Sequence, residues 1–192
     1  MPLVAAVLST VATLWLTGGL HEDGLADVAD GLGGFVPPER ALEIMKDSRL
    51  GAYGAMALVM ALLAKLSLVA LLVDIRVQWA ALLLCSIHVL SRMAPLALMQ
   101  CLPYVGQAAH SKALHAAGRP LAARGLVAAT LWCLPALALT GWLGGLPLVI
   151  GLVLPGALAT AAMVRWLRRR LGGMTGAVSY THLRAHETGR NL

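Results

Sequence analysis

The stretch that decides the fold class is GAMALVMALLAKLSLVALLV, residues 54–73, whose one charged residue is Lys65. About 20 apolar residues in a row are what a helix needs to cross the hydrocarbon core of a membrane. Outward from this stretch, the chain has further apolar stretches of similar length at residues 2–20, 79–102, 126–143 and 144–164. We therefore predict an all-α, polytopic membrane helical bundle of about five crossings, with one polar helical segment on its cytoplasmic side.

The composition supports this class of protein. Of the 192 residues, 59% are hydrophobic and 12% are charged, and the mean hydropathy is +0.78. Soluble domains carry about 25% charged residues, and a soluble globule of this size cannot bury so much apolar surface. These numbers exclude a soluble enzyme, and they exclude a disordered chain as well.

The distribution of Lys and Arg predicts the orientation in the membrane. If residues 21–53 are cytoplasmic and the crossings alternate, the opposite side holds only Arg76. Positive charge favours the cytoplasmic side of a membrane, where loops face anionic headgroups, so we interpret the basic character as membrane-related and not as nucleic-acid binding. The cytoplasmic side then holds ten basic residues: Arg40, Lys46, Arg49, Lys112, Arg119, Arg124, Arg165, Arg168, Arg169 and Arg170.

Residues 21–53 form the charge-dense segment, and its carboxylates have a regular spacing. Asp23, Asp27 and Asp30 are spaced i, i+4, i+7, which places them on one face of a helix. Like charges at this spacing destabilise a helix, so a divalent cation is the natural compensation. Oxygen ligands favour Mg2+, which shares its shell with substrate phosphates. We predict a metal–diphosphate site, with Glu22 as a further ligand and His21 beside it; the alternative is a solvated acidic face.

The second polar motif is KDSRLGAYG, residues 46–54, after a short helix expected to begin near Pro38. Lys46 and Arg49 would neutralise phosphate charge, and Gly51 and Gly54 would let backbone amides approach a phosphate. A basic cluster before a crossing also serves as a membrane anchor. The phosphate-binding interpretation therefore depends on the acidic segment beside the motif.

Two cations lie inside predicted crossings. Lys65 and Arg92 each cost about 2.5–3.5 kcal/mol on insertion scales, so such residues face a cavity or a partner. One interpretation is that they line a substrate cavity and bind phosphates or the acidic segment. The other is a structural role, with Asp74 as the partner of Lys65.

Together the two motifs resemble those of a known family. GLHEDGLADVADG at 19–31 and KDSRLGAYG at 46–54 closely resemble cobalamin synthase, the adenosylcobinamide-GDP ribazoletransferase family. The resemblance extends through Arg92, Pro103-Tyr104 and residues 172–176, and covers residues 1–176 as one membrane transferase domain.

The resemblance implies a reaction and a location. A hydroxyl of alpha-ribazole, or of its 5'-phosphate, attacks adenosylcobinamide-GDP; GMP leaves, and the nucleotide loop of adenosylcobalamin (or its 5'-phosphate) is completed. It also implies a Mg2+ requirement, a multi-pass protein of the bacterial inner membrane, and an active site that faces the cytoplasm. The lipid bilayer is then a partner, and an oligomer is compatible with this.

The resemblance also implies site roles. Metal held at the three aspartates of the acidic segment would bridge the diphosphate. Lys46 and Arg49 would hold phosphate oxygens. The acceptor of the ribazole proton stays open between Asp47, Asp30 and His21.

Two other functions fit parts of the pattern. A CDP-alcohol phosphotransferase of phospholipid synthesis also uses an acidic motif and Mg2+, but its DG-x-x-A-R pattern lacks its arginine here. An ion-transport protein without catalytic activity would use the acidic segment for ion entry, but the chain shows no internal repeat.

The ends of the chain depart from the family. A further N-terminal membrane segment is expected before residue 1, and Ala177 stands where the family has an Asp. The string SYTHLRAHETGRNL, residues 179–192, resembles translated sequencing-adapter DNA. We interpret residues 1–176 as an incomplete domain and residues 177–192 as a non-native tail.

Overall fold

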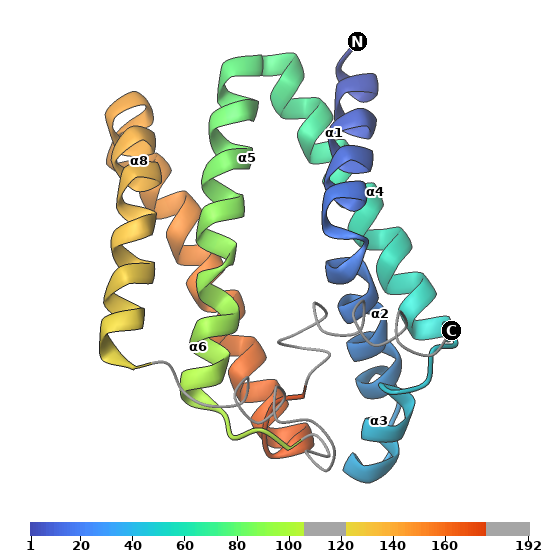
Figure 1. Ribbon diagram of the computed structural model, residues 1–192. Helices are drawn as coiled ribbons and strands as arrows, with labels where there is room; N and C mark the ends of the chain where they lie inside the picture. Colours follow the sequence, from blue (N-terminus) through green and yellow to red (C-terminus); the bar gives the residue numbers. More distant parts are fainter. Residues whose placement is uncertain (106–121, 176–192) are drawn as a thin grey trace, which may run out of the picture. The chain divides into compact units, whose positions relative to one another are not determined.

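The computed structural model (Figure 1) describes residues 1–105 and 122–175, and within them it confirms the all-α prediction. These ranges hold no strand beyond an isolated parallel bridge between Tyr104 and Met174. Most of the predicted loop at 103–125 and the predicted tail lie outside the described residues. The helices are α1 Pro2–Thr17, α2 Leu20–Gly33, α3 Pro38–Ile44, α4 Ala52–Ile75, α5 Val77–Ser91, α6 Met93–Cys101 and α8 Ala123–Leu171.

Three spans in the described part of the chain are long and apolar enough to cross a membrane: α4, α5 with α6, and α8. A fourth is added if α1 and α2, bent by 86°, count as one broken span. The predicted number was about five, and the difference arises at α8. Its 49 residues would extend about 74 Å as one straight helix, more than twice the hydrocarbon thickness.

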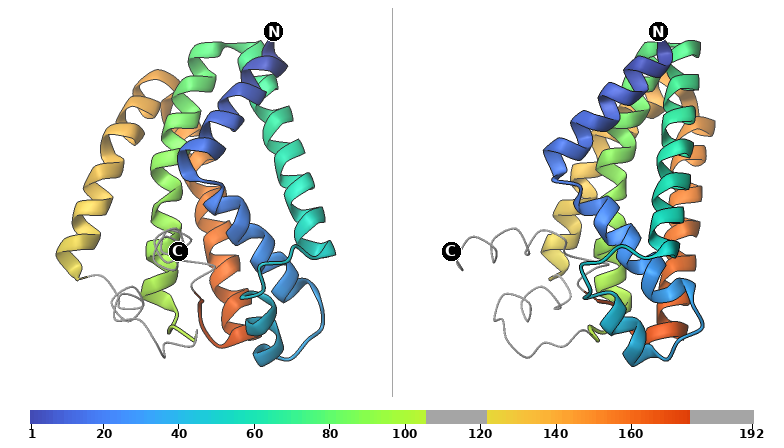
Figure 2. Two further views of the ribbon diagram at one scale, coloured as in Figure 1. Left: turned by 45° about the vertical axis from the view of Figure 1, so that its right-hand side comes forward. Right: turned by 90° about the vertical axis from the view of Figure 1, so that its right-hand side faces the viewer.

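A break inside α8 resolves this length. Gly145 has φ 73° and ψ 176°, a conformation that glycine adopts without a steric penalty. Figures 1 and 2 show the two halves of α8 running in opposite directions on either side of the break. The predicted division near Gly144-Gly145 is therefore confirmed, and each half has the length of a crossing.

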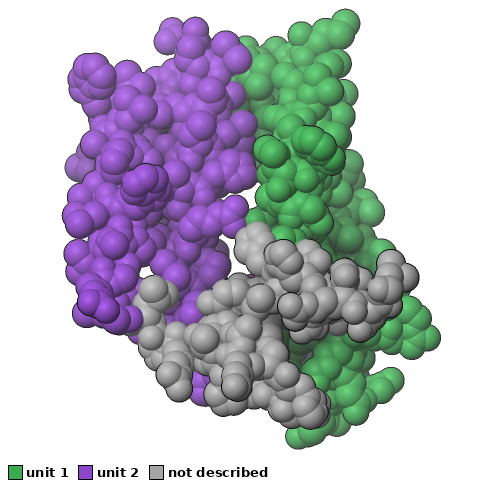
Figure 3. All heavy atoms as spheres, viewed as in Figure 1, with its two compact units in different colours: residues 1–75, 175–192 green, residues 76–174 purple. Residues whose placement is uncertain are grey.

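The described chain divides into two compact units (Figure 3), the first formed by residues 1–75 with Thr175. In this unit α1 meets α2 at Gly18 and Gly19, both with left-handed φ angles of 63° and 69°. Helix α4 then packs along α2 and α1. The short α3 begins at Pro38, as predicted, because proline suits the first turn of a helix.

The second unit, residues 76–174, packs α5 and α6 against α8. We expected a kink at Pro95, and the helix breaks at Arg92 instead. The reason is the proline itself, which lacks an N–H and whose ring clashes with the carbonyl four residues earlier, that of Ser91. Between α5 and α8, the buried hydroxyls of Ser86 and Thr140 are 2.9 Å apart.

We predict that Thr140→Val lowers the free energy of unfolding by about 0.6–1.7 kcal/mol, the range measured for hydrogen bonds between membrane helices. The Thr140 hydroxyl donates to Ala136 O, so it accepts from Ser86, whose buried hydroxyl would lose its partner. The matched control is Thr160→Val, because the Thr160 hydroxyl donates to Gly156 O of its own helix. Unfolding in mixed micelles measures both variants, and equal losses would contradict the prediction.

Candidate functional site

The carboxylate of Asp30 joins the two polar motifs. Gly51 N donates to Asp30 Oδ2 at 2.8 Å, and Gly54 N donates to Asp30 Oδ1 at 2.7 Å. A Cβ on either glycine would collide with this carboxylate, so the close approach requires glycine at both positions. The acidic helix α2 and the KDSRLGAYG motif therefore meet at one place in the first unit.

This contact also caps α4. The first N–H groups of a helix have no partner within the helix, and they carry the positive end of its dipole. The Asp30 carboxylate, supplied by a different helix, accepts from two of them. We expected these amides to face a phosphate and Asp30 to bind a metal. Each carboxylate oxygen keeps a further lone pair, so metal binding by Asp30 stays a prediction.

Glycines of α2 also admit α3 and the start of α4. A Cβ on Gly31 would lie 3.0 Å from Ala41 O and 2.6 Å from the Met45 side chain. One on Gly33 would lie 2.6 Å from the Tyr53 ring. No role was predicted from the sequence for Met45 or Tyr53. The missed signal was a pair of glycines two residues apart on α2, each facing a large side chain of another segment.

The remaining acidic residues lie on α2 as predicted, and its first turn holds Glu22 and Asp23. Asp23 and His21 are exposed, and Asp27 is half-buried. The Oε2 atom of Glu22 is buried, and no hydrogen-bond partner from the described residues reaches it. Within residues 1–105 and 122–175, no three His, Cys, Asp or Glu side chains form a metal cluster.

The donor set nevertheless fits Mg2+. This ion takes one or two carboxylates from the protein and completes its shell with water and substrate phosphates. The carboxylates of α2 supply oxygen ligands of the right kind, and a buried Glu22 oxygen without a hydrogen bond is available for a cation.

Asp47 and Arg49 form an ion pair with several contacts. Arg49 Nε lies 3.0 Å from both Asp47 oxygens, Arg49 Nη2 lies 2.6 Å from Oδ2, and the Arg49 backbone N–H donates to Oδ1. Hydrogen bonds from the guanidinium, and then from the backbone N–H, lower the pKa of Asp47 to about 2. Asp47 therefore stays ionised at neutral pH and is a weak base, while Lys46 is exposed beside it.

Helix geometry separates the two interpretations of Lys65. Lys65 lies 11 residues after Gly54, about three turns, so both share the face of α4 that meets α2. Asp74 is nine residues beyond Lys65, about two and a half turns, and lies on the opposite side of α4. This favours the acidic segment over Asp74 as the partner of Lys65. Arg92 belongs to the second unit, where it is exposed between α5 and α6.

We predict opposite effects of one substitution at two glycines. Gly54→Ala lowers the free energy of unfolding by about 1–3 kcal/mol, because its methyl group collides with the Asp30 carboxylate. Gly151→Ala raises it by up to about 1 kcal/mol, because a Cβ there meets nothing within 4 Å and alanine favours the helix. Unfolding in mixed micelles measures both variants. A neutral Gly54→Ala variant would show that α4 does not depend on Asp30.

Comparison with known proteins gives a family match over nearly the whole chain. The model of the family described as Cobalamin-5-phosphate synthase matches residues 1–179. No solved structure matches. Residues 1–179 include both polar motifs and all the helices described above.

Curated relatives carry one name, adenosylcobinamide-GDP ribazoletransferase. That of Polaromonas naphthalenivorans is 49% identical over 188 residues, covering 91% of this chain and 67% of the relative. That of Leptothrix cholodnii is 49% identical over 178 residues, with 90% and 66% covered. That of Shewanella amazonensis is 43% identical over 181 residues, with 90% and 65% covered.

The chain thus spans about two thirds of the length of these relatives. With the family model matched over residues 1–179 and relatives at 43–49% identity, this multi-pass membrane chain belongs to the cobalamin-5-phosphate synthase family, enzymes of cobalamin biosynthesis.

Proposed function

We propose that the protein transfers the phosphocobinamide part of adenosylcobinamide-GDP to alpha-ribazole or its 5'-phosphate, forming adenosylcobalamin or its 5'-phosphate and releasing GMP. The observation that carries the proposal is the Asp30 contact, because it brings an acidic helix and a cationic motif to one place. The names of the relatives support it. Family membership favours this reaction over phospholipid synthesis and over ion transport.

The acidic helix is the proposed Mg2+ site. Asp23 and Asp27 would hold the ion, with Glu22 and Asp30 as further oxygen donors. When bound, Mg2+ would neutralise charge on the diphosphate and on the departing GMP. A buried Glu22 oxygen that has no hydrogen bond within the described part of the chain supports this assignment, since a cation would supply the missing interaction.

The cationic motif is the proposed phosphate-binding element. Arg49 uses Nε and Nη2 on Asp47, which fixes the plane of the guanidinium and leaves its remaining N–H groups for phosphate oxygens. Lys46 adds a mobile positive charge beside it. Asp47 therefore acts as a positioning residue for Arg49.

We propose that His21 is the base that accepts the proton of the ribazole hydroxyl. An imidazole accepts a proton near neutral pH, whereas the low pKa of Asp47 makes it a weak base. Asp30 is held by two backbone N–H groups and has a structural task. Lys65, on the α4 face that meets the acidic helix, and Arg92 are proposed to contact substrate phosphates.

The location is also part of the proposal. The predicted excess of Lys and Arg on one side supports a location of the acidic helix at the cytoplasmic face of the bacterial inner membrane. GTP-derived substrates are available on that side, and the bilayer surrounds the apolar spans.

The first test is release of GMP. Membranes holding this chain, or a version extended to the length of its relatives, receive adenosylcobinamide-GDP, alpha-ribazole and Mg2+. Asp23→Asn and Asp27→Asn in the extended version should each lower GMP release by at least a hundredfold, and EDTA should abolish it, with insertion unchanged. Glu39→Gln, on the exposed start of α3, is the control and should retain activity. Full activity of both aspartate variants would contradict the metal assignment.

The pH profile tests the proton acceptor. We expect kcat of the extended version to fall at acidic pH, because a protonated imidazole cannot accept the ribazole proton. His21→Gln should lower kcat and remove this limb. Asp47→Asn should raise KM and leave the limb in place, because Asp47 is ionised at every pH above about 3. An unchanged profile in His21→Gln would exclude His21 as the base.

A further inference from the structure

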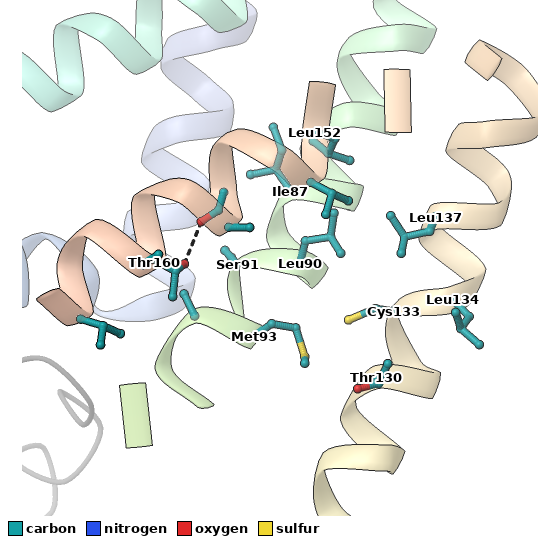
Figure 4. A pocket seen from close by; sticks show the side chains of 16 residues that line it. Ile87, Leu90, Ser91, Met93, Thr130, Cys133, Leu134, Leu137, Leu152 and Thr160 are labelled. Carbon is teal, nitrogen blue, oxygen red and sulfur yellow. Dashed lines mark hydrogen bonds between the residues drawn. The ribbon is translucent and has the colours of Figure 1, made fainter. Parts of the chain in front are cut away.

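The second unit contains a cavity of about 520 Å3 between α5, α6 and both halves of α8. Figure 4 shows Ile87, Leu137 and Leu152 at one end, and Met93 and Thr130 toward the other. The volume lies within the range of about 300–1,000 Å3 typical of small-ligand sites. All lining residues belong to helices with the composition of membrane spans.

The polar groups of the lining are already occupied. The hydroxyls of Ser91, Thr130 and Thr160 each donate to a carbonyl of their own helix, at 2.8–3.0 Å. Their hydrogens are therefore not available to a ligand, and the other lining side chains are hydrocarbon, apart from the sulfur atoms of Met93 and Cys133. A nucleotide or sugar would lose its hydration here without replacement, whereas a hydrocarbon chain would not.

Two cations flank one end of the cavity. Arg92 lies between the lining residues Ser91 and Met93, and Arg165 directly follows the lining residue Val164. Both arginines are exposed. An apolar cavity with positive charge at one end complements a molecule with a hydrocarbon chain and an anionic head.

We propose that this cavity binds one acyl chain of an anionic glycerophospholipid, with the phosphate headgroup at Arg165. The size favours a chain over a protein segment. A helix about 10 Å across occupies about 400 Å3 per turn, so the cavity would admit little more than one turn. The cavity is formed by residues of the second unit alone, and its proposed occupant does not depend on the proposed reaction.

The test is photolabelling of the full chain in phosphatidylcholine nanodiscs. A trace of phosphatidylglycerol with a diazirine near the end of its acyl chain is activated, and labelled peptides are mapped by mass spectrometry. We expect label on peptides from α5 and from both halves of α8 that line the cavity. A phosphatidylcholine probe with the same chain should label these peptides several-fold less.

Two glycines of α8 provide a matched pair of variants. A Cβ at Gly156 or at Gly151 meets nothing within 4 Å, but only Gly156 is among the lining residues. Gly156→Leu should fill the cavity and reduce labelling several-fold, and Gly151→Leu should not. Ala157→Leu is a second filling variant if Gly156→Leu fails to fold. Equal labelling of wild type and filled variants, or equal loss in Gly151→Leu, would overturn the proposal.

A further pair tests the headgroup. Arg165→Gln should reduce the preference for phosphatidylglycerol over phosphatidylcholine. Arg76→Gln should leave it unchanged, because Arg76 lies at the opposite end of α5 from Arg92. Equal labelling of the wild-type cavity by the phosphatidylglycerol and phosphatidylcholine probes would contradict the proposal. Cross-links between two copies of the chain at an unlabelled cavity would also contradict it.

Discussion

The first unit depends on one carboxylate that serves two helices. Asp30 belongs to the last turns of α2, and its oxygens accept the N–H groups of Gly51 and Gly54 where α4 begins. This contact fixes the distance between the acidic helix and the cationic motif, although 20 residues separate Asp30 from Gly51 in the chain. The same interaction therefore positions the candidate site and stabilises α4, the helix that follows it in the chain.

Glycine spacing is the sequence counterpart of this contact. Gly51 and Gly54 lie against Asp30, and Gly31 lies against Met45 and the Ala41 carbonyl. Each lacks a Cβ at a point where another element approaches to within van der Waals distance or less. The polar site is therefore built between backbones and not between long side chains, which limits how far the two motifs can move apart.

The sequence predicts the class of fold and its main divisions, for local reasons. Apolar length identifies the spans, proline marks the start of α3, and a glycine pair marks the division of α8. These features depend on residues close together in the chain. A kink was predicted at Pro95, but the helix breaks at Arg92, because a proline disturbs the turn that precedes it.

The site was predictable in its residues but not in its pairings. Spacing placed Asp23, Asp27 and Asp30 on one helix. The spacing did not predict that Asp30 accepts hydrogen bonds from backbone amides at the start of another helix. From the sequence, Asp47 and Arg49 were both predicted to act on the substrate, whereas in the structure they form an ion pair with each other. Partners of this kind follow from tertiary packing, which periodicity does not encode.

The reversal at Gly145 has a consequence for how the protein enters its membrane. Its two apolar arms leave the chain's Arg124 end and its Arg165–Arg170 end on the same side, so neither cationic end has to be translocated. The pair can be inserted as one hairpin, with the loop passing through the bilayer first. A single residue without a side chain thus decides which side of the membrane receives the C-terminal end of α8.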